Sequence, residues 1–536
     1  MNTAINPPSA WLSAGMALGA GILFALPYLY ADWYALSWIA FVPLLFSSRQ
    51  LPMFQVYGGG FLFGLGCYVT ATFWSVDFLM LFKQFASTPA VLWSLLFWIY
   101  SAQLPALMLL VYEWLRRNSG VSECLLFPVV AVVFYGSFPM LFSAQIGESQ
   151  SHFLIALQGV ELTGVHGLDA IVALSNVLLL RLVLMKKNVW RSAANWVGAT
   201  VVALWFGYGM LVLPIWQQKI ESWPRMQIGL VQPNEPPHLG AKEIYPGYSQ
   251  AYPPEMEMTR RLALAGAELV IWPESAYKGY FDNHLLTDAY QHEVSNIGVS
   301  LLLQDIKKQR TGGSVGMLNT VTLLDENGQS QGEYQKIKRV AFGEYVPFVS
   351  EVPVLRRWVE AFFGEFLNEI EQGQQQVAFR LQPPDQTPVT IIPLICYETM
   401  FPVFVADAVS QNAEAGLLVA VSSNAWFGAS RQPFQHITSA VLRAVENRMP
   451  MVHVVNNGPS TVTTPYGRVM LQTSFRQAGG YLAQVPVYKE GNAEPPGHSF
   501  YSRYPRWFLT CIYVVLAGVA LRALIRRRPC AEPRHV

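Results

Sequence analysis

The sequence predicts a helical membrane domain of about eight spans joined to a water-facing α/β domain. The chain has 36 Lys and Arg residues and 35 Asp and Glu residues, and only 15 of these lie in residues 1–216, about 7% of that stretch. A domain with so few charges could not present a polar surface to water, so this part is predicted to lie in lipid. After residue 216, short aliphatic runs alternate with helical patterns, which is typical of an α/β domain.

Seven apolar stretches of about bilayer length precede residue 217, and an eighth lies near the C-terminus. The first is not expected to be a cleaved signal peptide, because no Lys or Arg precedes it, and the second is short and could be re-entrant. We predict a seven-span domain over 1–216, a second domain over 217–506, and a last span with a basic tail over 507–536. The predicted spans lie at 11–30, 33–47, 57–80, 89–114, 122–142, 170–185, 194–216 and 507–526.

The basic residues of the loops predict the orientation of the chain. Alternate connections are basic, whereas the intervening short connections carry only Lys83. Basic loops face the cytoplasm, so we expect both termini there and residues 217–506 on the far side of the membrane. In a bacterium, that is the periplasmic side of the inner membrane or the cell exterior. One miscounted span would move this domain to the cytoplasm, but the basic tail argues against that. The basic residues are Arg49; Arg116 and Arg117; Lys186, Lys187 and Arg191; Arg522, Arg526, Arg527, Arg528 and Arg534.

The composition excludes several classes of function. A net charge of +1 argues against a nucleic-acid partner, which demands an excess of Lys and Arg, and a hydrophobic content of 52% argues against disorder. No Gly-rich phosphate loop, zinc-type Cys/His spacing or Gly-x-Ser-x-Gly motif is found in the sequence. We therefore expect neither a nucleotide cofactor nor a metal.

The α/β domain is predicted from β-branched and aliphatic runs that end in polar or turn residues. Helical patterns lie at Pro254–Ala267 and His436–Arg448. The turn sequence Asp325-Glu326-Asn327-Gly328 predicts a hairpin over Leu323–Glu333. The predicted strands are Met226–Val231, Glu268–Trp272, Val299–Leu303, Thr320–Asp325, Val389–Cys396, Gly416–Ser422 and Met451–Asn456.

Three polar sites occur where apolar runs end. Glu274 follows one run, Lys336 and Glu344 lie beyond Tyr334, and Cys396 ends the run that begins at Ile391. Strand ends in α/β folds are where polar groups converge on a ligand. A carboxylate can accept the thiol proton, an ammonium favours thiolate and oxyanion, and the thiolate can attack a carbonyl to give a thioester. Taken singly, such a Glu or Lys is more often solvated or ion-paired.

The α/β domain contains one of the five cysteines, Cys396, so it cannot form an internal disulfide. A lone cysteine is most often a buried structural residue. Outside the cytoplasm, a free thiol is also open to oxidation. The sequence around Cys396 therefore has to decide between a structural thiol and a nucleophile.

The order of Glu274, of Lys336 in a Tyr-x-Lys context and of Cys396-Tyr397-Glu398 resembles the nitrilase, or carbon–nitrogen hydrolase, superfamily. Within it, the eight-span frame and the segment Phe342-Gly343-Glu344-Tyr345-Val346-Pro347 resemble the apolipoprotein N-acyltransferase family. These matches favour the nucleophile over the structural thiol. Further matches lie at Trp38–Leu45, Gly60–Gly66, Glu161–Leu168, Ala425–Gly428, Gln435–His436 and Leu442–Glu446.

The resemblance implies an αββα nitrilase-like domain and an N-acyltransferase with a Glu-Lys-Cys triad and no cofactor. Glu274 would be the general base, Cys396 the nucleophile and Lys336 the residue that steadies the oxyanion. A phospholipid would acylate Cys396, and the α-amine of the N-terminal diacylglyceryl-cysteine of an apolipoprotein would attack the thioester. The remaining implied residues, which would bind or orient substrate, are Glu344, beside Lys336 and the amine; Tyr397, whose backbone N–H could donate to the oxyanion; Glu398; and Trp426.

Several residues differ from those usual in the family's sequence motifs. Asn424 stands where an Asp is usual, and Ile337, Arg339 and Ala341 replace a His, a Leu and a Pro. These changes leave the triad intact but bear on the donor lipid, the acceptor and the rate, so a paralogue with another acceptor stays open. His436 keeps its family context, although a lone His is more often structural.

Three alternatives remain open at this point. Residues 352–367 carry Trp, Phe and Leu on one helical stripe, which fits an interfacial arm or an ordinary amphipathic core helix. A membrane-tethered amidase or nitrilase would pass the acyl group to water. A non-catalytic scaffold or transporter would need charges within the spans, and Asp77 is the main candidate there.

Overall fold

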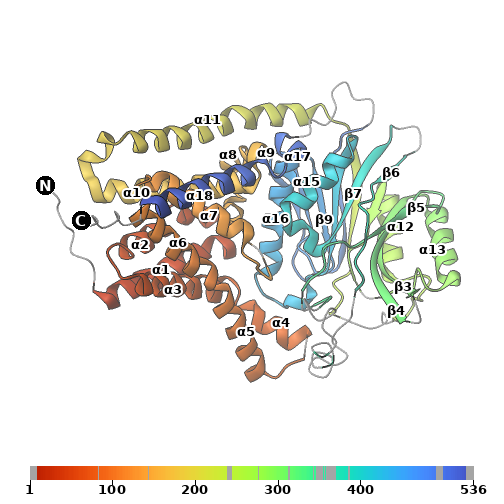
Figure 1. Cartoon of the computed structure of the whole chain (residues 1–536). Coiled ribbons are helices and arrows are strands. Elements are labelled where there is room, and N and C mark those ends of the chain that lie inside the picture. Colours follow the sequence, from red (N-terminus) through yellow and green to blue (C-terminus); the bar gives the residue numbers. More distant parts are fainter. Residues whose placement is uncertain are drawn as a thin grey trace, which may run out of the picture. The chain divides into compact units, whose positions relative to one another are not determined.

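The described part of the chain forms two compact units in this computed structural model (Figure 1). Unit 1 is built from residues 1–76, 88–212 and 504–536, and unit 2 from residues 77–87 and 213–503. The predicted basic tail beyond Arg526 and nearly all of 352–367 lie outside the described residues. The structure describes residues 9–82, 84–142, 144–237, 244–275, 277–311, 314–341, 343–345, 354, 357, 370–383, 387–489 and 499–526.

Unit 1 is helical. Among the described residues, five helical stretches are long and apolar enough to cross a membrane, and α3 with α4, bent by 55°, could form a sixth span. The elements that lie wholly or mainly in unit 1 are α1 (Ala10–Leu29), η1 (Ala31–Trp38), α2 (Phe41–Ser47), α3 (Met53–Ala71), α5 (Ser87–Ser101), α6 (Gln103–Asn118), α7 (Glu123–Ser137), η2 (Ile146–Gln150), α8 (Leu154–Leu157), α9 (Val160–Thr163), α10 (Val165–Met185), η3 (Lys186–Arg191), α11 (Ala193–Glu221) and α18 (Trp507–Arg526). The helix α4 (Trp74–Phe82) begins in unit 1 and lies mainly in unit 2.

The predicted count of about eight spans is not confirmed by the described residues. The stretch predicted at 33–47 is divided between the 3₁₀ helix η1 and the seven-residue α2. The stretch predicted at 122–142 forms α7, which has 15 residues. At 1.5 Å per residue, such a helix covers about 22 Å of a hydrocarbon core that is about 30 Å thick.

Irregular backbone within unit 1 is held by buried polar side chains of α10. Asn176 donates from Nδ2 to the Ser37 carbonyl and accepts from the Phe41 N–H at Oδ1, each at 2.9 Å. Asp169 accepts from the Gly147 N–H at 2.6 Å. Backbone polar groups in lipid have no water to bind, so breaks between helices must be satisfied inside the protein. These contacts meet that requirement at η1 and η2.

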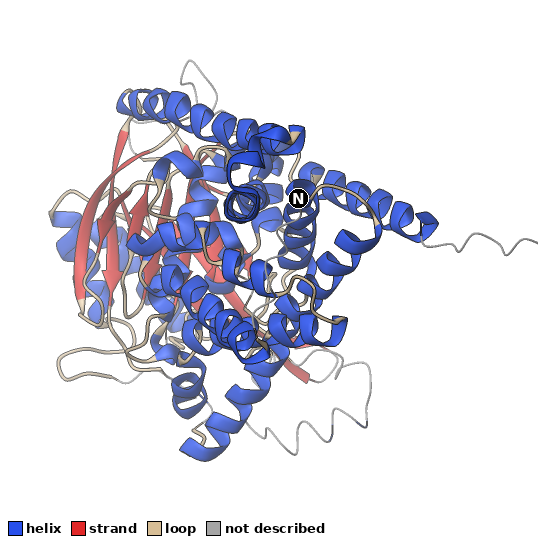
Figure 2. Cartoon of the chain, turned by 90° about the vertical axis from the view of Figure 1, so that its left-hand side faces the viewer, coloured by secondary structure: helices blue, strands red, loops and turns tan. Residues whose placement is uncertain are grey.

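Unit 2 contains two six-stranded sheets, shown in red in Figure 2. The first sheet has the strand order β12-β1-β2-β3-β4-β5 and the second β11-β10-β9-β8-β7-β6. The strands are β1 (Arg225–Gln232), β2 (Leu269–Ile271), β3 (Ser300–Thr311), β4 (Ser314–Leu324), β5 (Ser330–Gln335), β6 (Phe379–Leu381), β7 (Val389–Ile395), β8 (Ala415–Ser422), β9 (Met451–Val455), β10 (Thr461–Thr463), β11 (Val469–Gln472) and β12 (Gly479–Pro486).

Alternation along the buried strands produces three apolar layers. In β8, Leu417 and Val419 belong to the core shared by the two sheets, whereas Leu418 and Ala420 face α15 and α16 on the other side. The outer face of the first sheet packs against α12 and α13. Because successive side chains of a strand point to opposite faces, strands covered on both faces read as continuous apolar runs. The helices and 3₁₀ turns of unit 2 are α12 (Pro254–Leu264), α13 (His284–Ile297), η5 (Cys396–Met400), α15 (Pro402–Gln411), η6 (Ala425–Phe427), α16 (Gln432–Asn447) and α17 (Phe500–Arg503).

Candidate active site

Cys396 stands at the carboxyl end of β7, where the chain turns sharply into η5. Its φ is +50°, in the left-handed region that side-chain-bearing residues rarely adopt. Such a backbone conformation costs energy and persists only where the surrounding structure imposes it. The turn ends the strand at the thiol, and the residue is half-buried.

Glu274 follows β2 in the other sheet, and both of its carboxylate oxygens accept N–H groups. Asn319 donates from Nδ2 to Oε1 at 2.7 Å, and the Ser423 backbone N–H donates to Oε2 at 3.1 Å. This carboxylate is close enough to the Cys396 thiol to raise its pKa. The base and the nucleophile implied by the resemblance therefore belong to one site.

Lys336 follows β5, and its side chain is 1% exposed. Its ammonium lies 2.6 Å from Oε1 of Glu344, whose Oε2 accepts the Val340 N–H at 2.8 Å. Glu344 thus fixes the ammonium and closes its own loop. The neighbouring motif residues Phe342, Val346 and Pro347 lie outside the described part of the chain.

The charges of these side chains are coupled. Burial raises the pKa of the Cys396 thiol, the Glu274 carboxylate raises it further, and Lys336 opposes both. Burial alone would lower the pKa of Lys336, but Glu344 and Glu274 outweigh that effect and hold it above its usual value. Lys336 is therefore a permanent cation, and the resting thiol is protonated and needs a base to become a nucleophile.

Glu398 is fully buried, and its carboxylate binds the protein's own donors. Oε1 accepts the N–H groups of Ile337 and Lys338 at 2.7 and 3.0 Å, and Oε2 accepts the Ile395 N–H at 2.8 Å. The Tyr334 hydroxyl lies 2.8 Å from each oxygen. Burial raises the pKa of Glu398, and the backbone donors oppose the rise. This side chain ties the residues after Lys336 to the residue before Cys396.

The other two expected orienting residues border the nucleophile and α4. The buried Tyr397 ring packs edge-on against Phe401 at 4.9 Å. The half-buried Trp426 packs edge-on against Phe82 at 4.7 Å, and Phe427 stacks on Phe78 at 5.3 Å. Phe78 lies at the end of the stretch predicted to span the membrane at 57–80, and Phe82 lies just beyond it, yet both belong to unit 2. Hydropathy gave no sign of that grouping.

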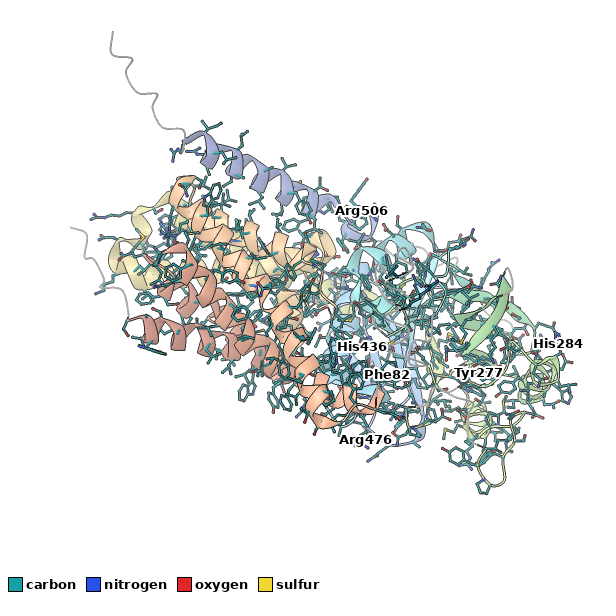
Figure 3. All side chains as sticks on the ribbon, turned by 60° about the horizontal axis from the view of Figure 1, so that its bottom comes forward. Phe82, Tyr277, His284, His436, Arg476 and Arg506 are labelled. Atoms are coloured by element: carbon teal, nitrogen blue, oxygen red, sulfur yellow. The ribbon has the colours of Figure 1, made fainter. Side chains whose placement is uncertain are left out.

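His436, labelled with Phe82 in Figure 3, lies against the backbone of the nucleophile. Its Nε2 is 3.2 Å from the Cys396 carbonyl oxygen and 2.9 Å from the Thr399 hydroxyl, and its Nδ1 is 3.2 Å from Oδ1 of Asn424. Burial lowers the pKa of His436 to about 4. The imidazole is therefore neutral at neutral pH.

We expect Asn424→Asp to make the protein less sensitive to acid. A His whose folded-state pKa is depressed contributes stability above its unfolded pKa near 6.5 and loses it as pH falls towards about 4, by up to about 1.4 kcal/mol per pH unit. A carboxylate beside Nδ1 would stabilise the imidazolium and reduce that loss. The measurement is the thermal unfolding midpoint of unit 2 at pH 7 and pH 5.

Asn327→Asp, at an exposed turn, is the matched control for that substitution. Burial also lowers the pKa of His453, whose ring lies 4.6 Å from that of His436, but this contribution is common to all three proteins. An Asn424→Asp protein that loses as much stability as the unsubstituted one between pH 7 and pH 5 would contradict the expectation.

Three residues at the site were not predicted: Asn319 and Ser423, which bind Glu274, and Gln304, which binds Asn319 at 2.9 Å. Asn319 and Gln304 are 2% and 1% exposed, in β4 and β3. An amide in the middle of an apolar strand needs a partner when buried. Isolated amides within strand-like runs were the signal that could have identified the pair.

The chain matches two family models and several curated relatives. The carbon-nitrogen hydrolase family model matches residues 248–489, and the apolipoprotein N-acyltransferase N-terminal domain model matches residues 20–178. The apolipoprotein N-acyltransferase of Geobacter metallireducens is 28% identical, covering 96% of this chain and 95% of that protein. The apolipoprotein N-acyltransferase of Pseudomonas putida is 27% identical, covering 96% and 97%.

Among solved structures, an amidase from Nesterenkonia sp. is 18% identical and covers 49% of this chain and 90% of that chain, with a TM-score of 0.34. The two family models fall on the helical N-terminal part and on the two-sheet part in turn, and the relatives extend over almost the whole chain. The chain therefore belongs to the apolipoprotein N-acyltransferase family, with a nitrilase-like carbon–nitrogen hydrolase domain.

Proposed function

We propose that this protein moves a fatty acyl group from a phospholipid, through a thioester on Cys396, to the α-amine of the N-terminal diacylglyceryl-cysteine of an apolipoprotein. The observation that carries this proposal is the convergence of Glu274 and the buried Lys336 ammonium on Cys396, where the carboxylate raises the pKa of the thiol and the ammonium lowers it. The three residues form the Glu-Lys-Cys triad of the mechanism. The family membership points to the same reaction.

In the first half-reaction, Glu274 takes the thiol proton as sulfur attacks the acyl ester carbon. Negative charge develops on the carbonyl oxygen of the ester, where the Lys336 ammonium and the Tyr397 backbone N–H are the proposed stabilising groups. The bond from the acyl carbon to the glycerol oxygen then breaks. The proton on Glu274 passes to that oxygen, so lysophospholipid leaves and the thioester remains.

In the second half-reaction, the neutral α-amine attacks the thioester carbon. Glu274 accepts a proton from the amine as the carbon–nitrogen bond forms, and the expelled Cys396 thiolate recovers that proton. Glu344 holds Lys336 for both steps, and we assign it the further role of orienting the amine. Trp426 is a proposed wall of the substrate site.

We place the catalytic domain in the periplasm and the basic ends of unit 1 in the cytoplasm. Within unit 1, Arg522 and Arg526 of α18 donate to the Ser119 carbonyl at 3.0 and 2.9 Å. Ser119 directly follows α6, whose last turn carries Arg116 and Arg117. The basic end of the last span and a basic loop thus lie on the same side of unit 1, which supports the positive-inside assignment.

The test is product analysis with the full-length protein in mixed micelles. The donor is phospholipid with a labelled acyl chain, and the acceptor is a diacylglyceryl-cysteinyl peptide. We expect label on the peptide α-amine and one lysophospholipid per labelled peptide. The same peptide with its amine acetylated should receive none. Release of free fatty acid at equal rates with and without peptide would overturn the proposal in favour of a hydrolase.

A further inference from the structure

Each oxygen of the Glu274 carboxylate accepts one N–H group, one from the backbone and one from a side-chain amide. Its Oε2 accepts the Ser423 N–H at 3.1 Å, and a backbone N–H can only donate. Its Oε1 faces the side-chain amide of Asn319 at 2.7 Å, and an amide can present either NH₂ or C=O. Whether Oε1 of Glu274 faces an N–H group or a carbonyl oxygen therefore depends on the orientation of the Asn319 amide.

Gln304 decides that orientation. Its Nε2 donates to Oδ1 of Asn319 at 2.9 Å, so the Asn319 NH₂ group is the end left for Glu274. Gln304 is itself oriented, because its Oε1 accepts the backbone N–H of Ser275 at 3.3 Å. The backbone N–H of Ser275 can only donate, so it fixes the orientation of the Gln304 amide, and Gln304 in turn fixes that of the Asn319 amide.

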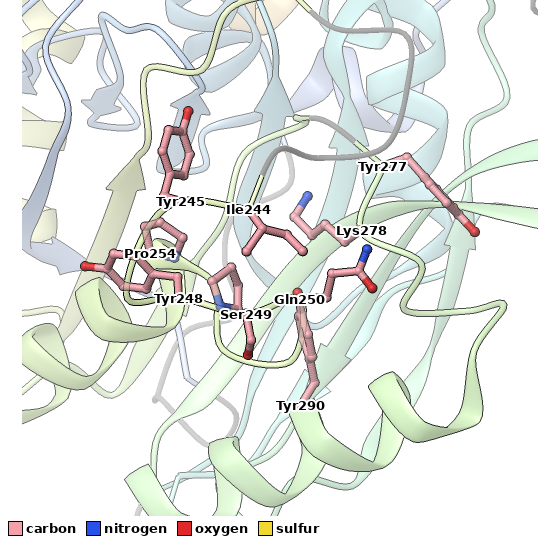
Figure 4. A pocket seen from close by; sticks show the side chains of 10 residues that line it. Ile244, Tyr245, Tyr248, Ser249, Gln250, Pro254, Tyr277, Lys278 and Tyr290 are labelled. Atoms are coloured by element: carbon pink, nitrogen blue, oxygen red, sulfur yellow. The ribbon is translucent and has the colours of Figure 1, made fainter.

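Gln304 and Asn319 form a relay of hydrogen bonds to Glu274, and this relay is buried and in contact with the rest of the site. Gln304 and Asn319 are 1% and 2% exposed, so water does not compete for their amides. The backbone carbonyl of Asn319 accepts the backbone N–H of Lys336 at 2.9 Å. Asn319 therefore contacts both the base and the residue that carries the ammonium. The Gln304 carbonyl accepts from Lys278 at 3.2 Å, and Lys278 lines a small pocket together with Tyr277 and Tyr290 (Figure 4).

We propose that Gln304 is a positioning residue of the acyl transfer: through Asn319 it presents an N–H to Glu274 and so keeps the general base ionised until the thiol proton arrives. Hydrogen bonds donated to a carboxylate favour its charged form. An amide turned the other way would face Glu274 with oxygen against oxygen, a contact that only a protonated Glu274 could satisfy. A protonated Glu274 cannot accept the thiol proton.

The inference rests on the proposed function for its consequence but not for its measurement. Iodoacetamide is uncharged and alkylates Cys396 without any lipid, so the pH profile of alkylation reports on the base directly. The full-length protein is used with Cys67, Cys124, Cys511 and Cys530 replaced by Ser or Ala. A failed N-acylation assay would then leave the alkylation result intact, and the two ideas fail separately.

Gln304→Glu reverses the relay and Gln304→Met removes it at similar volume. In Gln304→Glu, the new carboxylate accepts the Asn319 NH₂ group and turns Oδ1 towards Glu274. We expect its alkylation midpoint to move to higher pH by about one unit or more, which is about a tenfold lower rate at neutral pH. Gln304→Met, which leaves Asn319 free to turn, should move the midpoint in the same direction by a smaller amount.

The control is Gln329→Leu at an exposed position of the β4–β5 turn, which should reproduce the unsubstituted profile. Thermal unfolding of each variant separates a loss of fold from a change in the base. If Gln304→Glu does not fold, Gln304→Met decides alone. A midpoint unchanged in the folded Gln304 variants would overturn the proposal, because a merely structural glutamine would alter stability without moving the pH profile.

Discussion

Cys396→Ala should abolish formation of the acyl-enzyme and leave the fold intact. The thiol is the nucleophile of the proposed mechanism, and alanine removes one sulfur atom from a half-buried position. In Cys396→Ser, the rate of acyl-enzyme formation should fall by at least about a thousandfold. The pKa of an alcohol is much higher than that of a thiol, so a Glu carboxylate is far too weak a base for it. The measurement is label retained by the protein after incubation with acyl-labelled phospholipid.

Hydroxylamine sensitivity identifies the bond in that experiment. Label on the unsubstituted protein should be released by neutral hydroxylamine, as a thioester is. Cys511→Ser is the matched control, since Cys511 is an exposed cysteine of α18 in unit 1. Hydroxylamine-sensitive label retained by Cys396→Ala at the unsubstituted level would show that another residue carries the acyl group.

The α/β layers were predictable from sequence because burial on both faces produces continuous apolar runs. The run that precedes Ser422 is an example, since alternate residues enter two different cores. The strands β11 and β12 were missed because they alternate half-buried and exposed residues, and the Gly479-Gly480 pair lacks side chains that signal a strand. In the membrane unit, hydropathy located apolar stretches but not the breaks within them, since η1 and α3–α4 depend on tertiary partners.

The site likewise has features that could be predicted from the sequence and features that could not. The residue types and order of Glu274, Lys336 and Cys396 are local properties of the sequence, so they could be proposed without a structure. The environment of Glu274 could not, because Asn319 of β4 and Ser423, which follows β8, are 45 and 149 positions away in sequence. Long-range hydrogen bonds of this kind leave only one local trace, a polar residue within an apolar run.

Glu398, which the resemblance implies binds or orients substrate, is held by donors that lie far from it in sequence as well as near it. Its described hydrogen-bond partners are the Tyr334 hydroxyl and the N–H groups of Ile337, Lys338 and Ile395. A hydrogen bond to a charged group contributes about 1.5–3 kcal/mol. Several such bonds converge on one carboxylate, so the loop beyond Lys336 and the end of β7 depend on it together.

We therefore expect Glu398→Ala to combine a stability loss with a catalytic loss. Four donors would lose their acceptor in a dry interior, and the free energy of unfolding of unit 2 should fall by about 3 kcal/mol or more. The N-acylation rate of the folded fraction should fall at least about a hundredfold, the scale of one lost oxyanion donor, because Lys336 is no longer held relative to Cys396.

Glu398→Gln separates the two effects, and Glu414→Ala, at an exposed position before β8, is the control. The glutamine keeps one oxygen for Ile337 and Lys338 but sets an NH₂ group against the Ile395 N–H. We expect it to retain more stability than Glu398→Ala and to lose activity through kcat rather than KM, since the substrate contacts are unchanged. Urea unfolding followed by Trp fluorescence and steady-state N-acylation measure both quantities. A Glu398→Ala protein with the same stability and N-acylation rate as the unsubstituted protein would show that the hydrogen bonds to Glu398 do not position Lys336.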